Sequence, residues 1–277
     1  MTTTNKAVAL GFFDGVHLGH RAVIKAAPEP AVFTFKKAFK DNNINTGSTK
    51  HKLLRSCGAK QIYAYDFNDI KDLSPDEFVE EFLIGMMNVK VVCCGFDFKF
   101  GKGAKADAGD LARICNKAGI KTIIVPAVEI DNAPVSSTRI RELIAAGDIK
   151  VANRLLGYEL FYELKVVGGN MQGRTIGFPT INQDMPKKLV LPRYGVYKSC
   201  VYIEDKIYDG ITNIGVKPTA GNYKNPTAET HIINFNNDLY GRKIKIALVD
   251  FIREEKKFNS FDELKNQINE DLKWLKK

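Results

Sequence analysis

The chain has 277 residues, of which 44% are hydrophobic and 26% are charged, and this composition can fill one large core or two ordinary ones, which excludes a disordered or fibrous protein. Its 41 Lys and Arg residues outnumber its 32 Asp and Glu residues. The excess is spread over both halves without a basic tail, so it fits anionic small ligands such as nucleotides just as well as a nucleic acid, which usually meets a concentrated basic surface. We therefore expect no nucleic-acid partner.

The remaining composition indicates a cytoplasmic protein outside the membrane. Five cysteines without regular spacing predict neither a disulfide framework nor a metal cluster. Residues 1–6 lack the basic and apolar regions of a signal peptide, and no run of 18 apolar residues is present. We expect a monomer or a weak homo-oligomer.

Strand-like and helix-like segments alternate in the first half of the chain. This alternation predicts a parallel, doubly wound α/β sheet whose ligands lie at the C-terminal ends of its strands. A Ser74 cap followed by Pro75 marks a helix start. The predicted strands are 8–10, 31–35, 61–65, 89–94 and 122–125, and the predicted helices are 19–27, 49–57, 75–86 and 108–118.

After Leu156 the pattern changes to strand-like runs separated by Gly, Pro and Asn. It predicts an antiparallel barrel or sandwich, with a two-residue turn at Glu204 and Asp205 and a closing amphipathic helix over 260–275, capped by Ser260 and Glu263. The main predicted strands are 159–167, 195–204, 206–215, 230–235 and 243–252. We place the domain boundary at 155/156, which gives domains 1–155 and 156–277.

Residues 11–20, GFFDGVHLGH, follow the first strand directly and open the first helix. Backbone N–H groups and the helix dipole favour an anion at that point, and the imidazoles of His17 and His20 add hydrogen-bond donors. Gly19 leaves room for a close phosphate. Two of the four histidines of the chain fall in this turn, so we interpret it as a phosphate site; a pair of solvated surface histidines is the alternative.

Residues 135–141, VSSTRIR, stand after the fifth strand at a helix start. Hydroxyls, backbone amides and arginines suit a triphosphate leaving group. By itself the segment would be interpreted as a capped helix with solvated charges, and only its combination with the histidine turn favours a nucleotide site.

Residues 173–182, GRTIGFPTIN, are the densest signal in the second half. Two glycines bracket a loop able to fold over phosphates. Thr180 and Asn182 are two residues apart, so on an extended segment they point to the same side and can bind Mg²⁺ together with phosphate and water oxygens. A Gly-Pro hairpin loop is the alternative.

These motifs resemble those of two linked families. The first two resemble the H-x-G-H and S-S-T-x-x-R segments of nucleotidyltransferases, and GFFDGVHLGH is close to the string of prokaryotic FAD synthetases, the bifunctional riboflavin kinase/FMN adenylyltransferases. The third is similar to the G-R-x-x-G-F-P-T-x-N of riboflavin kinases at every fixed position, and further agreements lie at 194–197, 213–219, 229–231, 238–241 and 251–258.

The resemblance implies an enzyme that phosphorylates riboflavin to FMN and adenylylates FMN to FAD, with Mg²⁺ and ATP in both steps. It implies that His17 and His20 contact ATP phosphates, that Ser137 and Arg141 bind pyrophosphate, that Thr180 and Asn182 bind Mg-ATP, and that Glu229 is the catalytic base. The further implied nucleotide-binding residues are Gly11, Phe13, Asp14, Gly19, Thr138, Gly173, Arg174, Gly177 and Pro179. The implied flavin-binding residues are Asp97, Phe98 and Arg253.

The sequence departs from the family at the flavin end of the first domain. Where the family carries T-F-x-P-H-P, residues 34–39 read TFKKAF, without either proline or the histidine. Two alternatives follow: a riboflavin kinase whose diverged first domain has weak or no adenylyltransferase activity, and a flavin- or RNA-binding regulatory module with a degenerate site. The intact Thr180, Asn182 and Glu229 argue against the second, because a pure binder needs no base at a metal site.

Overall fold

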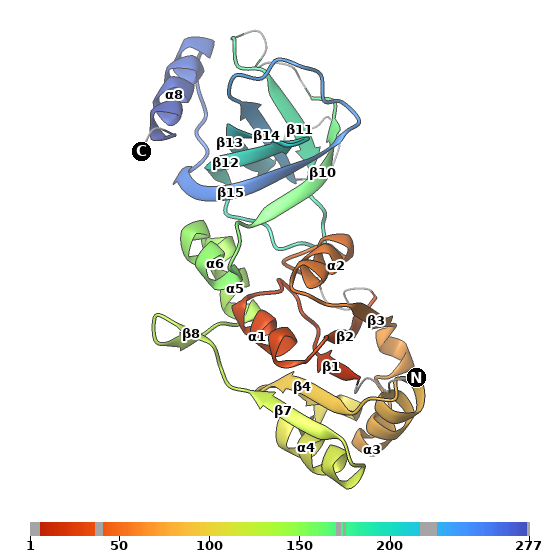
Figure 1. Cartoon of the computed structure of the whole chain (residues 1–277). Helices are drawn as coiled ribbons and strands as arrows, with labels where there is room; N and C mark the ends of the chain where they lie inside the picture. The colour runs from red at the N-terminus through yellow and green to blue at the C-terminus, as the bar shows by residue number, and fades with distance from the viewer. Residues whose placement is uncertain (1–5, 37–40, 170–172, 174–175, 217–225, 276–277) are drawn as a thin grey trace. The chain divides into compact units, whose positions relative to one another are not determined.

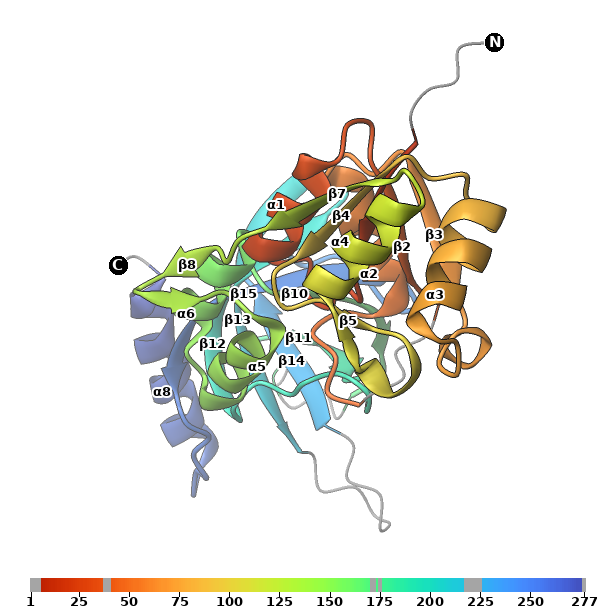
Figure 2. The same cartoon turned by 90° about the horizontal axis from the view of Figure 1, so that it is seen from below.

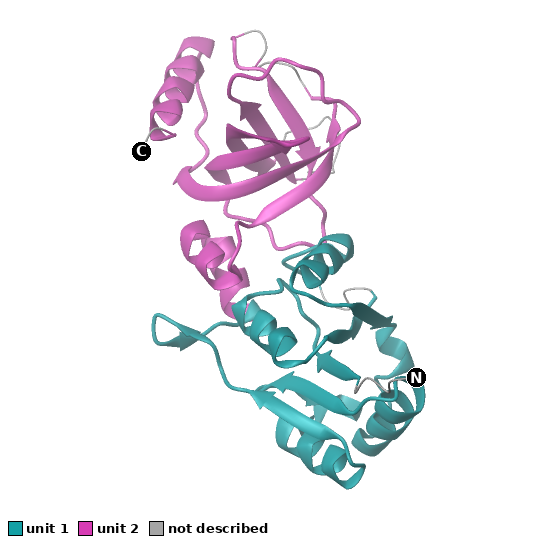
Figure 3. Cartoon of the chain, in the orientation of Figure 1, with its two compact units in different colours: residues 1–137 teal, residues 138–277 magenta. Residues whose placement is uncertain are grey.

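The computed structural model describes residues 6–36, 41–169, 173, 176–216 and 226–275. The chain forms two compact units, residues 1–137 and 138–277 (Figure 3). Two helices that precede the barrel in sequence, α5 (Ser137–Ala146) and α6 (Ile149–Leu156), fall almost entirely in the second unit. The physical reason is that α6 packs against strand β15 (Lys243–Arg253). The domain boundary at 155/156 stays a prediction.

The first unit contains a parallel five-stranded sheet in the order β3-β2-β1-β4-β7, as the alternating pattern predicted (Figure 1). All four residues of β1 are buried, and β1 is the central strand of the sheet. The turn that carries His17 follows its C-terminal end. The strands are β1 (Ala7–Leu10), β2 (Ala31–Phe35), β3 (Gln61–Tyr65), β4 (Val91–Gly95) and β7 (Lys121–Val125).

Capped helices connect these strands (Figure 2). Ser74 and Glu77 form the reciprocal capping box that starts α3, and Asp107 and Asp110 form another at α4. The chain after α3 continues as a π-helix, Phe78–Met86, which the sequence pattern predicted as ordinary helix. The α-helices of this part are α1 (Leu18–Ala26), α2 (Gly47–Ser56), α3 (Pro75–Glu77) and α4 (Ala108–Lys117).

Short elements escaped the sequence analysis because segments of two or three residues carry no periodicity. They are the hairpins β5 (Lys99–Phe100) with β6 (Ala106–Asp107) and β8 (Glu129–Ile130) with β9 (Ala133–Pro134), and the 3₁₀ turns Phe67–Asp69 and Lys102–Ala104. Among the described residues no helix combines the length and the apolar character needed to cross a bilayer.

The second unit contains a closed six-stranded barrel in the order β10-β11-β14-β13-β12-β15, which decides between the predicted barrel and sandwich. The two-residue turn at Glu204 and Asp205 is confirmed, with Glu204 at φ 55°. The added strand β11 has the polar sequence TINQD, so apolar alternation could not reveal it. The barrel strands are β10 (Phe161–Val167), β11 (Thr180–Asp184), β12 (Gly195–Ile203), β13 (Lys206–Val216), β14 (Pro226–Ile232) and β15.

The barrel interior combines an apolar core with a buried polar chain. Seven buried apolar residues pack together: Val166, Val201, Ile203, Ile232, Leu239, Ile244 and Ile246. Beside them the Thr212 hydroxyl donates to Ser199 Oγ at 2.8 Å and shares a hydrogen bond with Thr230 Oγ1 at 2.9 Å. Since each hydroxyl has a partner, the buried polar atoms carry little penalty.

The last helix, α8 (Phe261–Trp274), is joined to β15 by a buried ion pair. Arg253 donates through Nε and an Nη to the two oxygens of Asp271, at 2.8 and 2.7 Å. The Ser260 cap is confirmed, but the Glu263 carboxylate accepts the N–H of Asn259 in place of that of Ser260. The bidentate pair therefore fixes this helix to the end of the barrel.

We expect Asp271→Ala to lower the free energy of unfolding by about 3 kcal/mol, because it leaves the guanidinium of Arg253 partly buried and unpaired. Urea unfolding followed by circular dichroism measures the change. Glu270→Ala is the matched control, because its carboxylate is 62% exposed and its pair with Lys273 is a surface pair. Equal unfolding midpoints for the two variants would contradict this account.

Candidate active sites

The turn from β1 to α1 has an unusual backbone. Phe13, Gly15 and Val16 all have positive φ, at 56°, 84° and 40°. Phe13 and Val16 are nevertheless fully buried, so the surrounding protein holds them in a conformation that costs about 1–3 kcal/mol for each non-glycine residue. Such strain is concentrated at functional sites in proteins.

His17 and His20 are brought together at the start of α1, as the motif predicted. His17 caps the helix: its Nδ1 accepts the backbone N–H of His20 at 3.3 Å, which leaves its ring proton on Nε2. The two rings stack with centroids 3.5 Å apart. A Cβ on Gly19 would lie 3.2 Å from the His17 ring. Glycine at this position thus accommodates a neighbouring imidazole, and its predicted contact with phosphate stays a prediction.

The His20 imidazole is held in its neutral form. Burial lowers its pKa well below the ordinary value, and the nearby His17 and Lys50 lower it further. Its Nδ1 is buried and has no hydrogen-bond partner among the described residues. A neutral ring with an open nitrogen can make a hydrogen bond to a ligand without adding a charge.

Asp14 organises the loops around this turn. Its carboxylate Oδ1 accepts the backbone N–H of Ile44 at 2.9 Å, and its backbone carbonyl accepts the hydroxyl of Ser137 at 2.8 Å. The structure therefore joins the first motif to Ser137 of the second one. One turn further along α5, Arg141 donates to Thr138 Oγ1 at 3.3 Å, so these two predicted residues lie on one side of the helix start.

Other predicted residues of the first domain have structural contacts. A Cβ on Gly11 would lie 3.0 Å from the Phe13 ring, and that buried ring meets His20 edge to face. Phe98 stacks on Phe100 with centroids 5.7 Å apart and packs against the core, whereas Asp97 is exposed in the turn before β5. Their nucleotide and flavin contacts stay predictions. Residues 37–40, part of the diverged flavin segment, lie outside the described residues.

The barrel brings together the predicted kinase residues. On the antiparallel pair β11 and β14, Asn182 is paired with Glu229 and Thr180 with His231. Alternation along each strand places these four side chains on one face, opposite to that of the buried Thr230. A hydroxyl, an amide oxygen and a carboxylate therefore converge from positions far apart in sequence.

His231 supports the loop that leads to Thr180. Its Nδ1 is 2.8 Å from the carbonyl oxygen of Pro179, and its ring meets Phe178 edge to face. The loop itself needs its glycines: a Cβ on Gly173 would lie 2.3 Å from the Phe178 carbonyl oxygen, and Gly177 has φ 88°. Arg174 lies outside the described residues.

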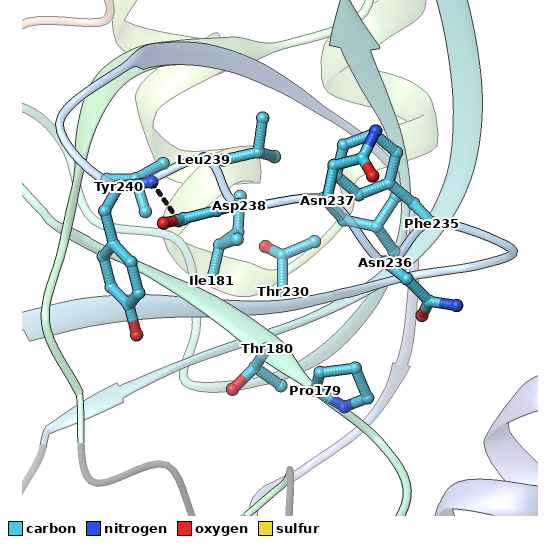
Figure 4. Close-up of a pocket in the computed structure, with 12 residues that line it drawn as sticks. Pro179, Thr180, Ile181, Thr230, Phe235, Asn236, Asn237, Asp238, Leu239 and Tyr240 are labelled. Atoms are coloured by element: carbon cyan, nitrogen blue, oxygen red, sulfur yellow. Dashed lines mark hydrogen bonds between the residues drawn. The ribbon is translucent and has the colours of Figure 1, made fainter.

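A cavity of about 200 Å³ opens beside Thr180 (Figure 4). Apolar side chains of the barrel line one part of it, and the β14–β15 loop lines the rest. The Asp238 carboxylate accepts the backbone N–H of Tyr240 at 2.8 Å, which shapes this loop. The lining residues are Val166, Pro179, Thr180, Ile181, Thr230, Ile232 and 235–240. An apolar slot with polar groups at its rim suits a flat heterocycle.

The donor set on the barrel fits magnesium. Thr180 and Asn182 offer neutral oxygens and Glu229 a carboxylate, the hard ligands that Mg²⁺ prefers, and Mg²⁺ usually takes only one or two such groups beside phosphate and water. Within the described ranges no cluster of three or more His, Cys, Asp or Glu could hold a metal by itself.

Arg253 was predicted to bind flavin, and the structure gives its guanidinium a set of protein partners. Two nitrogens bind Asp271, a third donates to the carbonyl of Glu254, and the group lies 5.9 Å from the centre of the Phe258 ring. The role of Arg253 in flavin binding stays a prediction. Asp271 lies on the same helix face as Leu264 and Ile268, and a carboxylate on that apolar face is the sequence signal that could have marked it as a buried partner.

The parallel sheet with its histidine turn, and the barrel with its oxygen-ligand face, define a transferase that joins a nucleotidyltransferase domain to a kinase domain. Residues 1–139 match the family described as FAD synthetase, and residues 156–277 match riboflavin kinase. The chain belongs to the family of bifunctional riboflavin kinase/FMN adenylyltransferases.

Known relatives cover nearly the whole chain. The bifunctional riboflavin kinase/FMN adenylyltransferase of Bacillus subtilis is 36% identical over 95% of this chain and 89% of its own length. That of Listeria monocytogenes is 32% identical over 98% of this chain and 91% of its own. A crystal structure described as a macrolide-efflux protein from Streptococcus pneumoniae has a TM-score of 0.89 and 32% identity, and the match covers 99% of this chain and 94% of that one.

We expect the His20 ring to remain neutral at about pH 6.5, where an ordinary imidazole is half protonated, because its burial lowers its pKa. Since the unfolded chain binds this proton and the folded chain does not, His20 removes stability as the pH falls below about 6.5. Histidine C–H shifts in a pH-titrated NMR series measure the effect. A His20 signal that titrates at the ordinary value would contradict the geometry.

Proposed function

We propose that this chain makes FMN from riboflavin and ATP in the barrel, and FAD from FMN and ATP at the histidine turn, releasing ADP and pyrophosphate respectively. The observation that carries the first reaction is the pairing of Glu229 with Asn182 on the face of β11 and β14 that also carries Thr180. The stacked His17 and His20 at the N-terminus of α1 carry the second.

In the kinase half, phosphoryl transfer needs alignment of the reacting groups, neutralised phosphates and a residue that orients the attacking oxygen. We assign the orienting and proton-accepting role to Glu229, with the primary hydroxyl of the ribityl chain as its partner. Thr180 and Asn182 hold the Mg-ATP phosphates, and the cavity lined by Ile181, Ile232 and 235–240 holds the nucleoside. Bound Mg²⁺ would supply charge neutralisation of the β- and γ-phosphates.

In the adenylyltransferase half, an oxygen of the FMN phosphate attacks the α-phosphorus of ATP and pyrophosphate leaves. Hydrogen bonds from His17 and His20 and the N-terminal dipole of α1 stabilise charge on the reacting phosphate. Ser137, Thr138 and Arg141 receive the departing pyrophosphate. The lowered pKa of His20, caused first by its burial, favours the neutral ring, which suits a hydrogen-bonding role.

We also propose that the protein acts in the cytoplasm as a monomer or weak homo-oligomer, without a nucleic-acid partner. Its proposed substrates are small molecules. Size-exclusion chromatography with light scattering tests the oligomeric part of the proposal.

Glu229→Gln should abolish FMN formation, because the amide cannot accept the hydroxyl proton, and should leave FAD formation from supplied FMN unchanged. Chromatography of the flavin products over time measures both reactions. The exposed Glu204→Gln on the same barrel is a matched control and should keep both activities. Loss of both reactions in Glu229→Gln would contradict independent sites.

The double substitution His17→Ala with His20→Ala should have the opposite result, with FMN accumulating and no FAD formed. Its physical reason is the loss of both ring donors at the phosphate site. The wild-type chain tests the alternative of a riboflavin kinase with a weak first domain. If that alternative holds, the wild type itself accumulates FMN and forms little FAD. Substitution without effect on FAD formation would exclude the histidine site.

Gly173→Ala should reduce riboflavin phosphorylation by roughly 100-fold. The added Cβ would lie 2.3 Å from the Phe178 carbonyl oxygen, so the loop must move, and its displacement disturbs the alignment of the nucleotide. Gly168→Ala is the matched control, because nothing lies within 4 Å of a Cβ there. Steady-state kinetics with riboflavin and Mg-ATP separate the two. Equal rates would show that the loop tolerates the displacement.

A further inference from the structure

Lys50 of α2 is a buried cation that no sequence motif marked. Only 6% of the residue is exposed, whereas lysine is almost never buried unless its charge is paired. Its Nζ donates three hydrogen bonds: to the carbonyl oxygens of Phe12 at 3.2 Å and Phe35 at 3.1 Å, and to Thr34 Oγ1 at 3.2 Å. Three acceptors use all three protons of the ammonium group.

These acceptors lie at the C-terminal ends of two adjacent parallel strands. Phe12 begins the turn after β1, and Thr34 and Phe35 are the last residues of β2. The Thr34 hydroxyl also donates to the Phe12 carbonyl at 2.9 Å, which closes the network. This edge is where ligands of open α/β sheets bind, so the buried charge lies beside the turn that carries the two histidines.

Several charged or titratable groups face Lys50. Asp14, from the β1–α1 turn, favours its charged form, whereas burial lowers its pKa to about 8. Burial lowers the pKa of His20 on α1 and of His51 on α2, and the ammonium of Lys50 lowers both further. The Phe12 ring also lies 4.7 Å below the ammonium. The charge of Lys50 therefore interacts electrostatically with Asp14 and His20 of the histidine turn.

A purely structural lysine would be a costly choice at this position. All three of its hydrogen-bond acceptors are uncharged, so desolvation of the ammonium is only partly offset. A fixed cation in a region of low dielectric instead contributes to the field that attracts and orients anionic phosphates. That benefit appears only when a ligand is bound.

We propose that Lys50 is a positioning residue of the adenylyltransferase site, where it fixes the Phe12 turn that leads to His17 and His20 and places a buried cation beside that turn. The inference rests on the proposed FMN adenylylation. It adds to that function a residue that lies outside the three recognised motifs and acts through the turn.

Lys50→Met should lower kcat for FMN adenylylation by roughly 10- to 100-fold, the loss expected when reacting groups are misplaced, and should leave riboflavin phosphorylation unchanged. Lys52→Met is the matched control: it removes a charge from an exposed position of the same helix and should keep both activities. Lys50→Arg retains the charge and should recover part of kcat. Wild-type kcat in a folded Lys50→Met variant would overturn the proposal.

The pH dependence gives a readout that a merely structural role would not change. In the wild type, adenylylation should fall above about pH 8 as Lys50 loses its proton, and this alkaline limb should be absent from Lys50→Met. If Lys50→Met does not fold, the pH profiles of adenylylation in the wild type and in Lys50→Arg test the proposal. A wild-type rate that does not fall above about pH 8 would overturn it. A fall above that pH that is unchanged in Lys50→Arg would also overturn it.

Failure of the underlying function gives a different result. If the wild type forms no FAD from FMN, the proposed adenylylation is wrong. The coupling of Lys50 to His20 can still be measured by NMR, where Lys50→Met should raise the pKa of His20 relative to Lys52→Met. An unchanged His20 titration would overturn the charge coupling whatever the activity.

Discussion

The first unit depends on how one short turn is held at the end of its central strand. Between β1 and α1 the backbone takes left-handed conformations at three positions, including the buried Phe13 and Val16. No local preference of these side chains favours that path. It is maintained by contacts from elsewhere in the unit: Asp14 binds the Ile44 N–H and the Ser137 hydroxyl, and Lys50 binds the Phe12 carbonyl. The histidine pair is therefore positioned by tertiary contacts.

In the barrel, regular strand pairing positions the candidate site residues. Strand pairing alone places Asn182 opposite Glu229 and Thr180 opposite His231, and a closed sheet allows little change of register. The irregular part is the loop before Thr180, which approaches its own backbone so closely that Gly173 has no room for a Cβ. The β11–β14 face that carries Thr180, Asn182 and Glu229, together with this close-packed loop, is a suitable arrangement for aligning two substrates and excluding water.

The two halves use charge differently. In the barrel, Thr180 and Asn182 offer neutral oxygens, Glu229 offers a carboxylate, and the cationic partner is expected to come with the nucleotide. In the sheet domain, the protein itself supplies a buried ammonium and two imidazoles near the phosphate turn. This contrast agrees with the chemistry proposed for each half: a hydroxyl must lose a proton to attack in one, whereas an FMN phosphate is already an anionic nucleophile in the other.

The sequence by itself determined the succession of elements and the identity of the three motifs, because periodicity, caps and glycine spacing are local properties. All five sheet strands and the two-residue turn at Glu204 follow from such patterns. Only the tertiary structure decided that the second half closes as a barrel, that polar β11 belongs to it, and that Arg253 is bound by Asp271. It also decided that Lys50 is buried. Each of these depends on which distant groups meet, and a lysine in a helix has the same local pattern whether its partner is water or another part of the chain.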